Sequence, residues 1–417
     1  MTAHEARVLM LVTELSMGGA ARVVRDVSAM LAGRFEVHEA VFNAADGVDF
    51  AGGAEPHSLD VAGGGGPATK LANLVRRVAR ARRLKRRLGI DVSISHLEGA
   101  HWVDVLSRGR ERVVLCVHGS ILHNRDIRGL AGWLRRRVIL PAVYNRADCI
   151  VTVSRDIAPE LESLGVAPRR IRTINNGFDL QRIAELGRAP MFEAEQAMLD
   201  GGPLLVTAGR IAEQKNQAAL IGILAALRRR RAARLAVLGD GPLRAELIRA
   251  AEDAGLRVWS VWSGEPLGPG FDLYLFGVDP NPFRWLARAD LFLFPSAWEG
   301  FPLALCEALA CGVPVVAADC LTGPREILAP QTSASASPIR SAESAPYGWL
   351  LPMLRDGPEG REAEAVWADT IERLLSDREE RRRLSEAGRV RIADFSRDKI
   401  AVQWIALVEE MVGRSPR

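Results

Sequence analysis

Short apolar runs alternate with longer amphipathic stretches along the whole chain. Candidate strands in the first half lie at residues 7–13, 37–42, 92–95, 113–117, 149–154 and 171–174; those in the second half lie at 204–208, 235–238, 274–276, 291–295 and 313–317. Segments with the period of an amphipathic helix lie between most of them. Apolar strands that alternate with helices form parallel sheets covered by helices. The pattern predicts an α/β protein with two doubly wound, Rossmann-like domains.

The break between the two sets of strands falls around residues 187–203, where a polar stretch leads into a fresh strand. The predicted domains are residues 1–190 and 200–398, and 417 residues are ample for two domains. A final helix at about 399–412 can pack back on the first domain. The polar, small-residue stretch at 330–348 predicts a loop.

Composition excludes a mostly disordered chain, a fibrous chain and a very small protein held together by disulfides. Hydrophobic residues make up 48% of the chain and charged residues 25%, as in soluble globular proteins. No apolar stretch is long enough for a membrane span, and the N-terminus lacks the positive segment of a signal peptide. The five cysteines form no CxxC pair, so we expect neither a zinc site nor disulfides, and a cytoplasmic location.

Charge is distributed unevenly, with a net +8 in residues 1–190 and −4 in the remainder. Residues 76–87 carry eight positive charges, and apolar residues recur among them at helical spacing, which predicts a basic amphipathic helix. A solvated arginine-rich face and a surface for anionic lipid or acceptor both fit this pattern. Nucleic acid fits less well, because no reader module accompanies the charges. The candidate surface residues are Arg76, Arg77, Arg80, Arg83, Arg86, Arg87 and, in a second basic segment, Trp133.

The segment 298–307 carries the strongest chemical signal. A strand ends, a loop turns, and a helix begins near Pro302, since proline is favoured in a first helical turn. The amides of Phe301 and Leu303 are donors suited to a phosphate. Glu299 precedes this helix and Glu307 lies inside it, so the two acids suit sugar and ribose hydroxyls on either side of the phosphate. A surface glutamate together with a helix-capping glutamate is the alternative.

Two further segments follow buried strands in the second half. Arg210 and Lys215 come after the strand at 204–208, and their charges suit a diphosphate, although a solvated pair has the same pattern. The segment Leu238-Gly-Asp-Gly-Pro242 predicts a tight turn and no more.

In the first half, Gly18 and Gly19 follow the first strand and allow a ligand to approach the backbone closely. His118 ends the strand at 113–117, where it faces either a ligand or only a loop. His96, His101 and His123 have similar positions with less context. The chain contains no Asp-x-Asp, which a metal-bridged diphosphate in a single-domain transferase usually requires.

Taken together, these segments resemble the retaining glycosyltransferases of family 4, which have the two-domain GT-B fold. The matching segments run in order: MGGAARV, VSRDI, INNGFD, AGRIAEQKN, LGDGP, the segment from ARADLF to PVVA, and GPREI. They extend from about residue 7 to 328. One departure is Ala21, where the family usually has an acidic residue.

The resemblance implies a role for each candidate residue. Arg210 and Lys215 hold the diphosphate of a nucleotide-sugar donor, Glu307 binds the ribose, and Glu299 orients the donor sugar. The remaining implied contacts are Phe301, Pro302 and Leu303 at the phosphate, with Gly18, Gly19 and His118 contributed by the first domain. No metal and no cofactor are implied.

Two other classes of protein remain as alternatives. Another GT-B enzyme, such as a sugar-nucleotide epimerase, acts without an acceptor, and a non-catalytic membrane-bound scaffold does not need these charged residues. A UDP-hexose or UDP-N-acetylhexosamine is the expected donor and GDP-mannose the alternative. The expected acceptor is a lipid-linked glycan in bacterial polysaccharide or glycoconjugate assembly.

Overall fold

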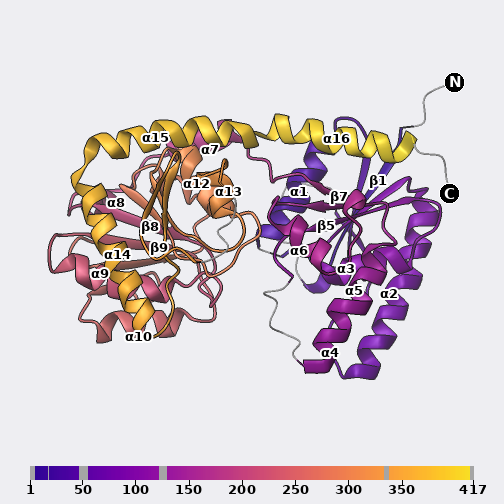
Figure 1. The fold of residues 1–417 in the computed structure, drawn as a ribbon, viewed down its shortest axis with the longest axis horizontal. Helices are drawn as coiled ribbons and strands as arrows, with labels where there is room; N and C mark the ends of the chain where they lie inside the picture. The colour runs from indigo at the N-terminus through magenta and orange to yellow at the C-terminus, as the bar shows by residue number, and fades with distance from the viewer. Residues whose placement is uncertain (1–4, 17, 47–54, 122–128, 333–337, 414–417) are drawn as a thin grey trace. The chain divides into compact units, whose positions relative to one another are not determined.

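The computed structural model describes residues 5–16, 18–46, 55–121, 129–332 and 338–413. The chain divides into two compact units, one formed by Met1–Gly177 with Arg397–Arg417 and the other by Phe178–Ser396 (Figure 1). Each unit has one predominantly parallel sheet with helices packed on it, which confirms the predicted α/β fold with two doubly wound domains.

The first unit is built on a seven-stranded sheet in the order β3-β2-β1-β4-β5-β6-β7, with every neighbouring pair parallel. Its central strands are almost completely buried, which explains their continuous apolar runs. The strands are β1 (Arg7–Val12), β2 (Glu36–Val41), β3 (His57–Ser58), β4 (Val92–His96), β5 (Arg112–Val117), β6 (Cys149–Thr152) and β7 (Ile171–Thr173).

Helices of the first unit follow its strands in turn, and the C-terminal helix joins them. This last helix, α16 (Arg397–Gly413), packs along α1 (Gly19–Leu31) and buries Ile400 and Trp404 (Figure 1). An ion pair of 3.1 Å between Arg34 Nε and Glu409 Oε1 adds to this contact. The others are α2 (Pro67–Leu88), α3 (Glu98–Leu106), α4 (Gly129–Leu134), α5 (Leu140–Tyr144) and α6 (Ile157–Ser163), with a π-helical turn at Arg135–Ile139.

The second unit has an eight-stranded sheet in the order β10-β11-β9-β8-β12-β13-β15-β14. Its strands are β8 (Leu204–Ala208), β9 (Arg234–Leu238), β10 (Val258–Ser260), β11 (Leu273–Gly277), β12 (Leu291–Phe294), β13 (Val315–Ala318), β14 (Glu343–Ala345) and β15 (Gly348–Leu351). Its helices are α7 (Leu180–Gly187), α8 (Glu193–Leu199), α9 (Leu220–Arg228), α10 (Arg244–Asp253), α11 (Phe283–Leu286), α12 (Leu303–Cys311), α13 (Pro324–Leu328), α14 (Pro358–Ser376) and α15 (Arg378–Ile392).

The described part of the stretch 330–348 differs from the predicted loop. It contains the antiparallel edge strand β14, which pairs with β15. Arg325 anchors this edge, because its guanidinium donates to Glu343 at 2.8–3.0 Å and to Asp319 at 2.8–3.0 Å. A long-range ion pair therefore anchors the edge strand β14, in a stretch whose local composition indicates a loop.

The division between the units falls at residues 177–178, before the break suggested by composition. The helix α7 packs on α11 and α12 of the second unit. The side chain of Asn281 donates to the Leu186 carbonyl at 3.0 Å, and Arg288 donates to the Gly187 carbonyl at 3.2 Å. These contacts attach α7 to the second unit, which begins at Phe178.

Candidate active site

The two central strands of the second unit carry the predicted donor-site residues. The strands β8 and β12 are neighbours, and the chain leaves β8 toward β9 on one side before β12 extends the sheet on the other. This arrangement is a topological switch point, where the loops at the carboxyl ends of parallel strands diverge and ligands commonly bind. Lys215 follows β8 and Glu299 follows β12, so the topology brings them to one place.

Lys215 and Glu299 form an ion pair at this switch point. The Lys215 Nζ lies 2.6 Å from Glu299 Oε1, and Glu299 is only 6% exposed. The Lys215 ammonium also lies 5.6 Å from the centre of the Phe294 ring, at the end of β12. The Lys215 ammonium is thereby held on the buried Glu299 carboxylate, beyond the carboxyl ends of the two central strands.

Hydrogen bonds between the loop after β8 and the loop after β12 fix this pair. The side-chain amide of Gln214 donates to the Trp298 carbonyl at 2.9 Å, and the Ala297 amide donates to the Gln214 carbonyl at 2.8 Å. Asn216 adopts a left-handed conformation and donates to the Leu354 carbonyl at 3.1 Å. Lys215 is therefore held between two anchored neighbours.

The segment Leu238-Gly-Asp-Gly-Pro242 packs directly against the loop after β8. Gly239 has φ 145°, and a Cβ on it would lie 2.1 Å from the Gly209 carbonyl oxygen. A Cβ on Gly241 would lie 2.2 Å from the Ile211 carbonyl oxygen. The glycines of this turn thus serve close packing of two loops at the strand ends.

A third loop supports the backbone at Glu299. The Thr322 hydroxyl donates to the Glu299 carbonyl. Gly323 has φ 95°, and a Cβ there would lie 2.4 Å from Pro302 Cδ and 2.9 Å from the Gly300 carbonyl oxygen. The loop after β13 therefore seats closely on the turn that begins α12.

The helix α12 begins as the sequence predicts. Pro302 is its N-cap residue and Leu303 its first helical residue, and among the described residues no side chain caps the helix. The Phe301 side chain is buried in an edge-to-face contact with Phe395, with ring centres 5.1 Å apart. Backbone amides at such a helix start are suited to an anionic oxygen. Glu307 lies one turn further along α12 and is 7% exposed.

Arg210 is the exposed member of the predicted set. Its carbonyl accepts a hydrogen bond from the Gln217 side chain at 3.1 Å, which fixes the backbone while the side chain faces solvent. The structure thus brings Lys215 and Glu299 into contact and places Arg210 on the same loop.

The switch point of the first unit lies between β1 and β4. Gly18 and Gly19 follow β1 and begin α1; both are exposed, and a Cβ on Gly18 would meet no atom within 4 Å. On the other side, Leu97 follows β4 with φ 70°, a costly conformation for a leucine. Such strained positions cluster at functional sites.

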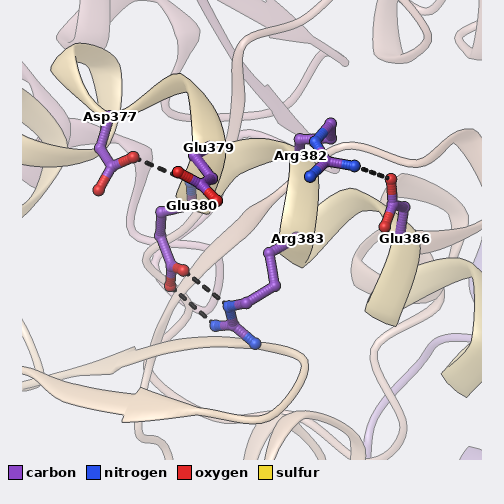
Figure 2. Close-up of a pocket in the computed structure, with 6 residues that line it drawn as sticks. All are labelled: Asp377, Glu379, Glu380, Arg382, Arg383 and Glu386. Carbon is purple, nitrogen blue, oxygen red and sulfur yellow. Dashed lines mark hydrogen bonds and ion pairs between the residues drawn. The ribbon is translucent and has the colours of Figure 1, made fainter.

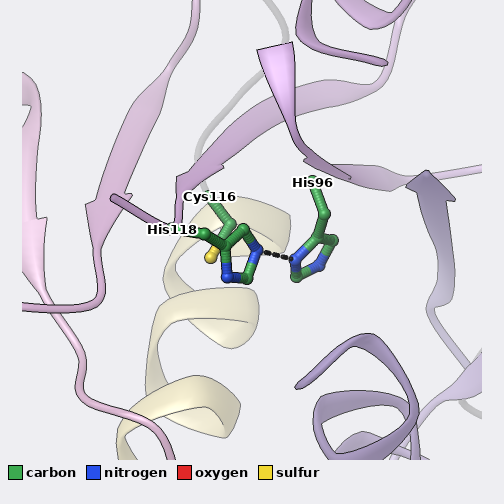
Figure 3. Close-up of side chains that lie close together, drawn as sticks. All are labelled: His96, Cys116 and His118. Carbon is green, nitrogen blue, oxygen red and sulfur yellow. Dashed lines mark hydrogen bonds between the residues drawn. The ribbon is translucent and has the colours of Figure 1, made fainter. Parts of the chain in front are cut away.

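His118 lies at the end of β5 beside His96, the last residue of β4. The His96 Nδ1 and His118 Nε2 are 2.8 Å apart (Figure 3). Burial lowers the pKa of His118 to about 4 and holds the pKa of His96 well below its usual value. Both imidazoles are therefore neutral near pH 7. His123 lies outside the described residues.

The sequence matches two family models. The model described as Glycosyltransferase Family 4 matches residues 17–182, and that described as Glycosyl transferases group 1 matches residues 202–345. The chain belongs to the family 4 glycosyltransferases. Its two units correspond to these two matches, and the order of sequence motifs from MGGAARV to GPREI agrees with this assignment.

Individual relatives agree with the family. An uncharacterised glycosyltransferase of Methanocaldococcus jannaschii is 28% identical over 301 residues, covering 69% of this chain and 70% of the relative. The N-acetylgalactosamine-N,N'-diacetylbacillosaminyl-diphospho-undecaprenol 4-alpha-N-acetylgalactosaminyltransferase of Campylobacter jejuni is 26% identical over 321 residues, covering 75% of this chain and 80% of the relative. The crystal structure of Anabaena Alr3699/HepE with UDP and glucose has a TM-score of 0.70 at 17% identity, covering 97% of this chain and 100% of that one. These similarities confirm the GT-B fold of the glycosyltransferase.

The basic helix α2 of the glycosyltransferase differs in part from the predicted solvated face. Arg77 stacks on the Phe42 ring at 4.3 Å and donates to the Val61 carbonyl at 3.1 Å, while Arg80 donates to the Asp60 carbonyl at 2.9 Å. Lys85 points inward and is buried. The other candidate arginines of this helix are exposed to solvent, namely Arg76, Arg83, Arg86 and Arg87.

Exposed apolar side chains accompany these charges on the first unit. Leu71 and Val75 lie one turn apart on α2 and are 64% and 62% exposed, and Trp133 on α4 is 57% exposed. Both helices reach the lower edge of this unit in Figure 1. None of the described helices has the length and apolar character to cross a bilayer.

A charged pocket on the second unit contains none of the candidate donor-site residues. It is formed along the start of α15 (Figure 2), where Glu380 pairs with Arg383 at 2.7–2.8 Å and Arg382 with Glu386 at 2.9 Å. Asp377 caps the helix by accepting from the Glu380 amide at 2.9 Å. These groups neutralise one another, as in an ordinary solvated helix start.

Sequence reasoning missed the supporting residues Gln214, Thr322 and Gly323 and the partner of His118. For Thr322 and Gly323 a signal was available, since they lie in the GPREI region that matches the family. For His96 the signal was its position at a strand end, shared by several histidines.

Proposed function

We propose that the chain is a retaining, metal-independent glycosyltransferase that moves a hexose or N-acetylhexosamine from a UDP-sugar to a lipid-linked glycan. The ion pair between Lys215 and Glu299, at the switch point beside the start of α12, is the observation that carries this proposal. The pair supplies a cation and a carboxylate, and the amides at the start of α12 follow Glu299 closely in the chain. A donor phosphate and its sugar need these three kinds of group.

The leaving diphosphate gains negative charge as the glycosidic bond breaks. Lys215, Arg210 and the amides of Phe301 and Leu303 are groups that stabilise this charge, and pre-aligned electrostatic stabilisation commonly contributes most to the acceleration of such reactions. Glu307, buried on the same helix, accepts from the ribose hydroxyls. No metal ion is required when these groups carry the charge.

Glu299 orients the donor sugar in this proposal. Its carboxylate already pairs with Lys215, so the donor diphosphate competes with Glu299 for the ammonium when it binds. The acceptor hydroxyl then attacks on the face from which the diphosphate leaves, and its proton passes to the leaving phosphate. The anomeric configuration is retained without a covalent intermediate. Gly18, Gly19 and His118 are the residues that we assign to the donor from the first unit.

The relatives support the choice of substrates. The name of the Campylobacter jejuni relative gives an N-acetylgalactosaminyl donor group and a diphospho-undecaprenol-linked acceptor. The Anabaena structure, similar in fold, was solved with UDP and glucose. These names favour a UDP-sugar and a lipid-linked acceptor for this chain, with GDP-mannose as the alternative donor.

The surface of the first unit supports a membrane-borne acceptor. Leu71 and Val75 are exposed on α2, which also carries exposed arginines, and Trp133 is exposed on α4, four residues before the exposed Arg137. Apolar residues beside cationic ones suit the interface of an anionic bilayer. We infer that the enzyme works at the inner face of the plasma membrane, bound peripherally and without nucleic acid.

Calorimetry with UDP, GDP and ADP tests the donor class. UDP should bind at least tenfold more tightly than the others, a difference of about 1.4 kcal/mol; preference for GDP would overturn the UDP assignment. Assays with UDP-sugars and an undecaprenyl-diphosphate glycan, followed by NMR of the product, test transfer and retention. Inversion, or loss of activity in EDTA with recovery in Mg²⁺, would contradict the mechanism. Release of free sugar without acceptor would instead indicate an epimerase.

A further inference from the structure

Three side chains with metal-binding atoms converge at the carboxyl ends of β4 and β5 (Figure 3). His96 is the parallel-ladder partner of Cys116. His118 lies two residues beyond Cys116, so both point to the same side of the sheet. One ligand atom from each of the three residues lies within 4.8 Å of the others.

The described residues do not provide a hydrogen-bond partner for every polar atom of this cluster. His96 and Cys116 are completely buried, and His118 is half-buried. The His96 Nδ1 pairs with His118 Nε2, but His96 Nε2 is buried and has no hydrogen-bond partner among the described residues. A buried polar nitrogen without a partner is costly, and native structures usually provide a reason for one.

The chemistry of the cluster and its surroundings favours a soft or borderline metal over a hard one. The three ligand atoms come from two imidazoles and a thiol, which are ligands of Zn²⁺ and not of Mg²⁺ or Ca²⁺. The neighbouring His101 is buried, and its Nδ1 lies 3.0 Å from the Ser95 hydroxyl.

We propose that His96, Cys116 and His118 form a Zn²⁺-binding site, although the spacing of the cysteines in the sequence predicts none. Three protein ligands with the fourth position open is a common arrangement for zinc. Zn–N bonds of about 2.0–2.1 Å and a Zn–S bond of about 2.3 Å place tetrahedral ligand atoms about 3.3–3.6 Å apart. One nitrogen of each imidazole and the Cys116 sulfur now lie within 4.8 Å of one another, so rotation of the side chains would have to bring them to these separations.

Zinc at this site inhibits the transferase, and this consequence rests on the proposed function. His118 belongs to the predicted donor site, and a metal bound to its ring fixes that ring away from a sugar. Binding converts the Cys116 thiol to a thiolate and releases one proton. Zinc binding itself is independent of the proposed function, since it needs no substrate.

Titration of the full chain with Zn²⁺, in competition with a chromophoric chelator, tests the site. We expect one tight Zn²⁺ per chain, and Co²⁺ should show the charge-transfer absorption of a thiolate ligand. Cys116→Ala and His96→Gln should each weaken binding at least about tenfold, because even partners outside the ligand sphere commonly contribute 10–100-fold. Cys149→Ala is the matched control, since Cys149 is equally buried on the adjacent strand β6.

Equal zinc affinity in wild type and Cys116→Ala, or no stoichiometric binding by the wild type, would overturn the site. In the activity arm, micromolar Zn²⁺ should inhibit wild type reversibly on chelation and leave Cys116→Ala uninhibited at unchanged basal turnover. Binding without inhibition would overturn only the regulatory consequence. An inactive enzyme that still binds Zn²⁺ through Cys116 would count against the proposed function and not against the site.

Discussion

The Lys215 ammonium and the Glu299 carboxylate lie 2.6 Å apart although 84 residues separate them in the chain. Each follows a strand, and these two strands are neighbours at the centre of the second sheet. A buried carboxylate thus holds a lysine that is 21% exposed at the point where the sheet opens. The pair makes the two residues interdependent, so their substitutions must be interpreted together.

Loss of Lys215 should affect turnover more than donor binding. Charge on the leaving diphosphate grows toward the transition state, so Lys215→Met should lower kcat by about 100–1000-fold with a much smaller change in KM. Steady-state kinetics on the UDP-sugar measure both. Lys399→Met, at an exposed lysine of α16, is the matched control and should change neither.

The same substitution leaves the buried Glu299 carboxylate without its cation. We therefore expect Lys215→Met to lower the melting temperature and Lys215→Met/Glu299→Gln to restore it without restoring turnover. Activity that returned with stability in the double variant would show that Lys215 acts only in folding.

Glu307 and Glu299 should separate nucleotide binding from turnover. Glu307→Ala removes a charged acceptor worth about 1.5–3 kcal/mol from the proposed ribose contact, so UDP affinity should fall about 10–100-fold in calorimetry. Glu299→Gln should leave UDP affinity within a few-fold of wild type and lower kcat, since Glu299 is assigned to the sugar. If Glu299→Gln weakened UDP binding and Glu307→Ala lowered only kcat, Glu299 would be the ribose contact and Glu307 the sugar contact.

Gly323 should be intolerant of a side chain. The Cβ of Gly323→Ala would lie 2.4 Å from Pro302 Cδ in a left-handed conformation, so we expect a loss of about 2–4 kcal/mol from strain and overpacking together. Gly357→Ala has a similar φ of 89° with no atom within 4 Å, and should show the backbone strain alone. Urea unfolding of both variants isolates the contact with Pro302. Equal losses would mean that the turn before α12 moves freely.

Lys85 should contribute to stability and not to membrane binding. Its Nζ lies 2.6 Å from Asp104 Oδ1 and 2.8 Å from Glu111 Oε1, and all three side chains are buried. Lys85→Met leaves two buried carboxylates without a cation and should cost about 3–5 kcal/mol in urea unfolding. Lys70→Met, exposed on the same helix, should cost less than about 0.5 kcal/mol.

The exposed arginines of α2 should govern association with anionic vesicles. Changing Arg76, Arg83, Arg86 and Arg87 to Gln removes about 1 kcal/mol of attraction per charge and should release the protein in co-sedimentation assays, while UDP binding stays intact. Salt at about 1 M, which shortens the Debye length to about 3 Å, should have the same effect on wild type. The charge-matched control changes four exposed arginines of the second unit: Arg229, Arg249, Arg361 and Arg378. If both variants were released equally from the vesicles, the association would depend on the net charge of the protein and not on α2.

The alternation of apolar runs with helical periods by itself determined that the chain forms two parallel-sheet units, because strands buried on both faces must be apolar along their length. The strand at Leu204–Ala208 agrees residue for residue with the predicted one, and most others differ by one or two residues. The start of α12 at Pro302 and Leu303 was equally local, since proline and a glycine turn specify a helix start. The length and composition of the segment 330–348 indicated only a loop. The local sequence there was insufficient to predict the edge strand β14.

Tertiary structure alone decided which of these local features meet. The pairing of Lys215 with Glu299 depends on β8 and β12 being neighbours, and the meeting of His96 with His118 depends on the register of β4 against β5. The edge strand β14 depends on Arg325 reaching Glu343, and the inward direction of Lys85 depends on two carboxylates from other elements. Sequence periodicity specifies which face of an element is apolar, whereas contacts between residues distant in sequence are set by strand order and register.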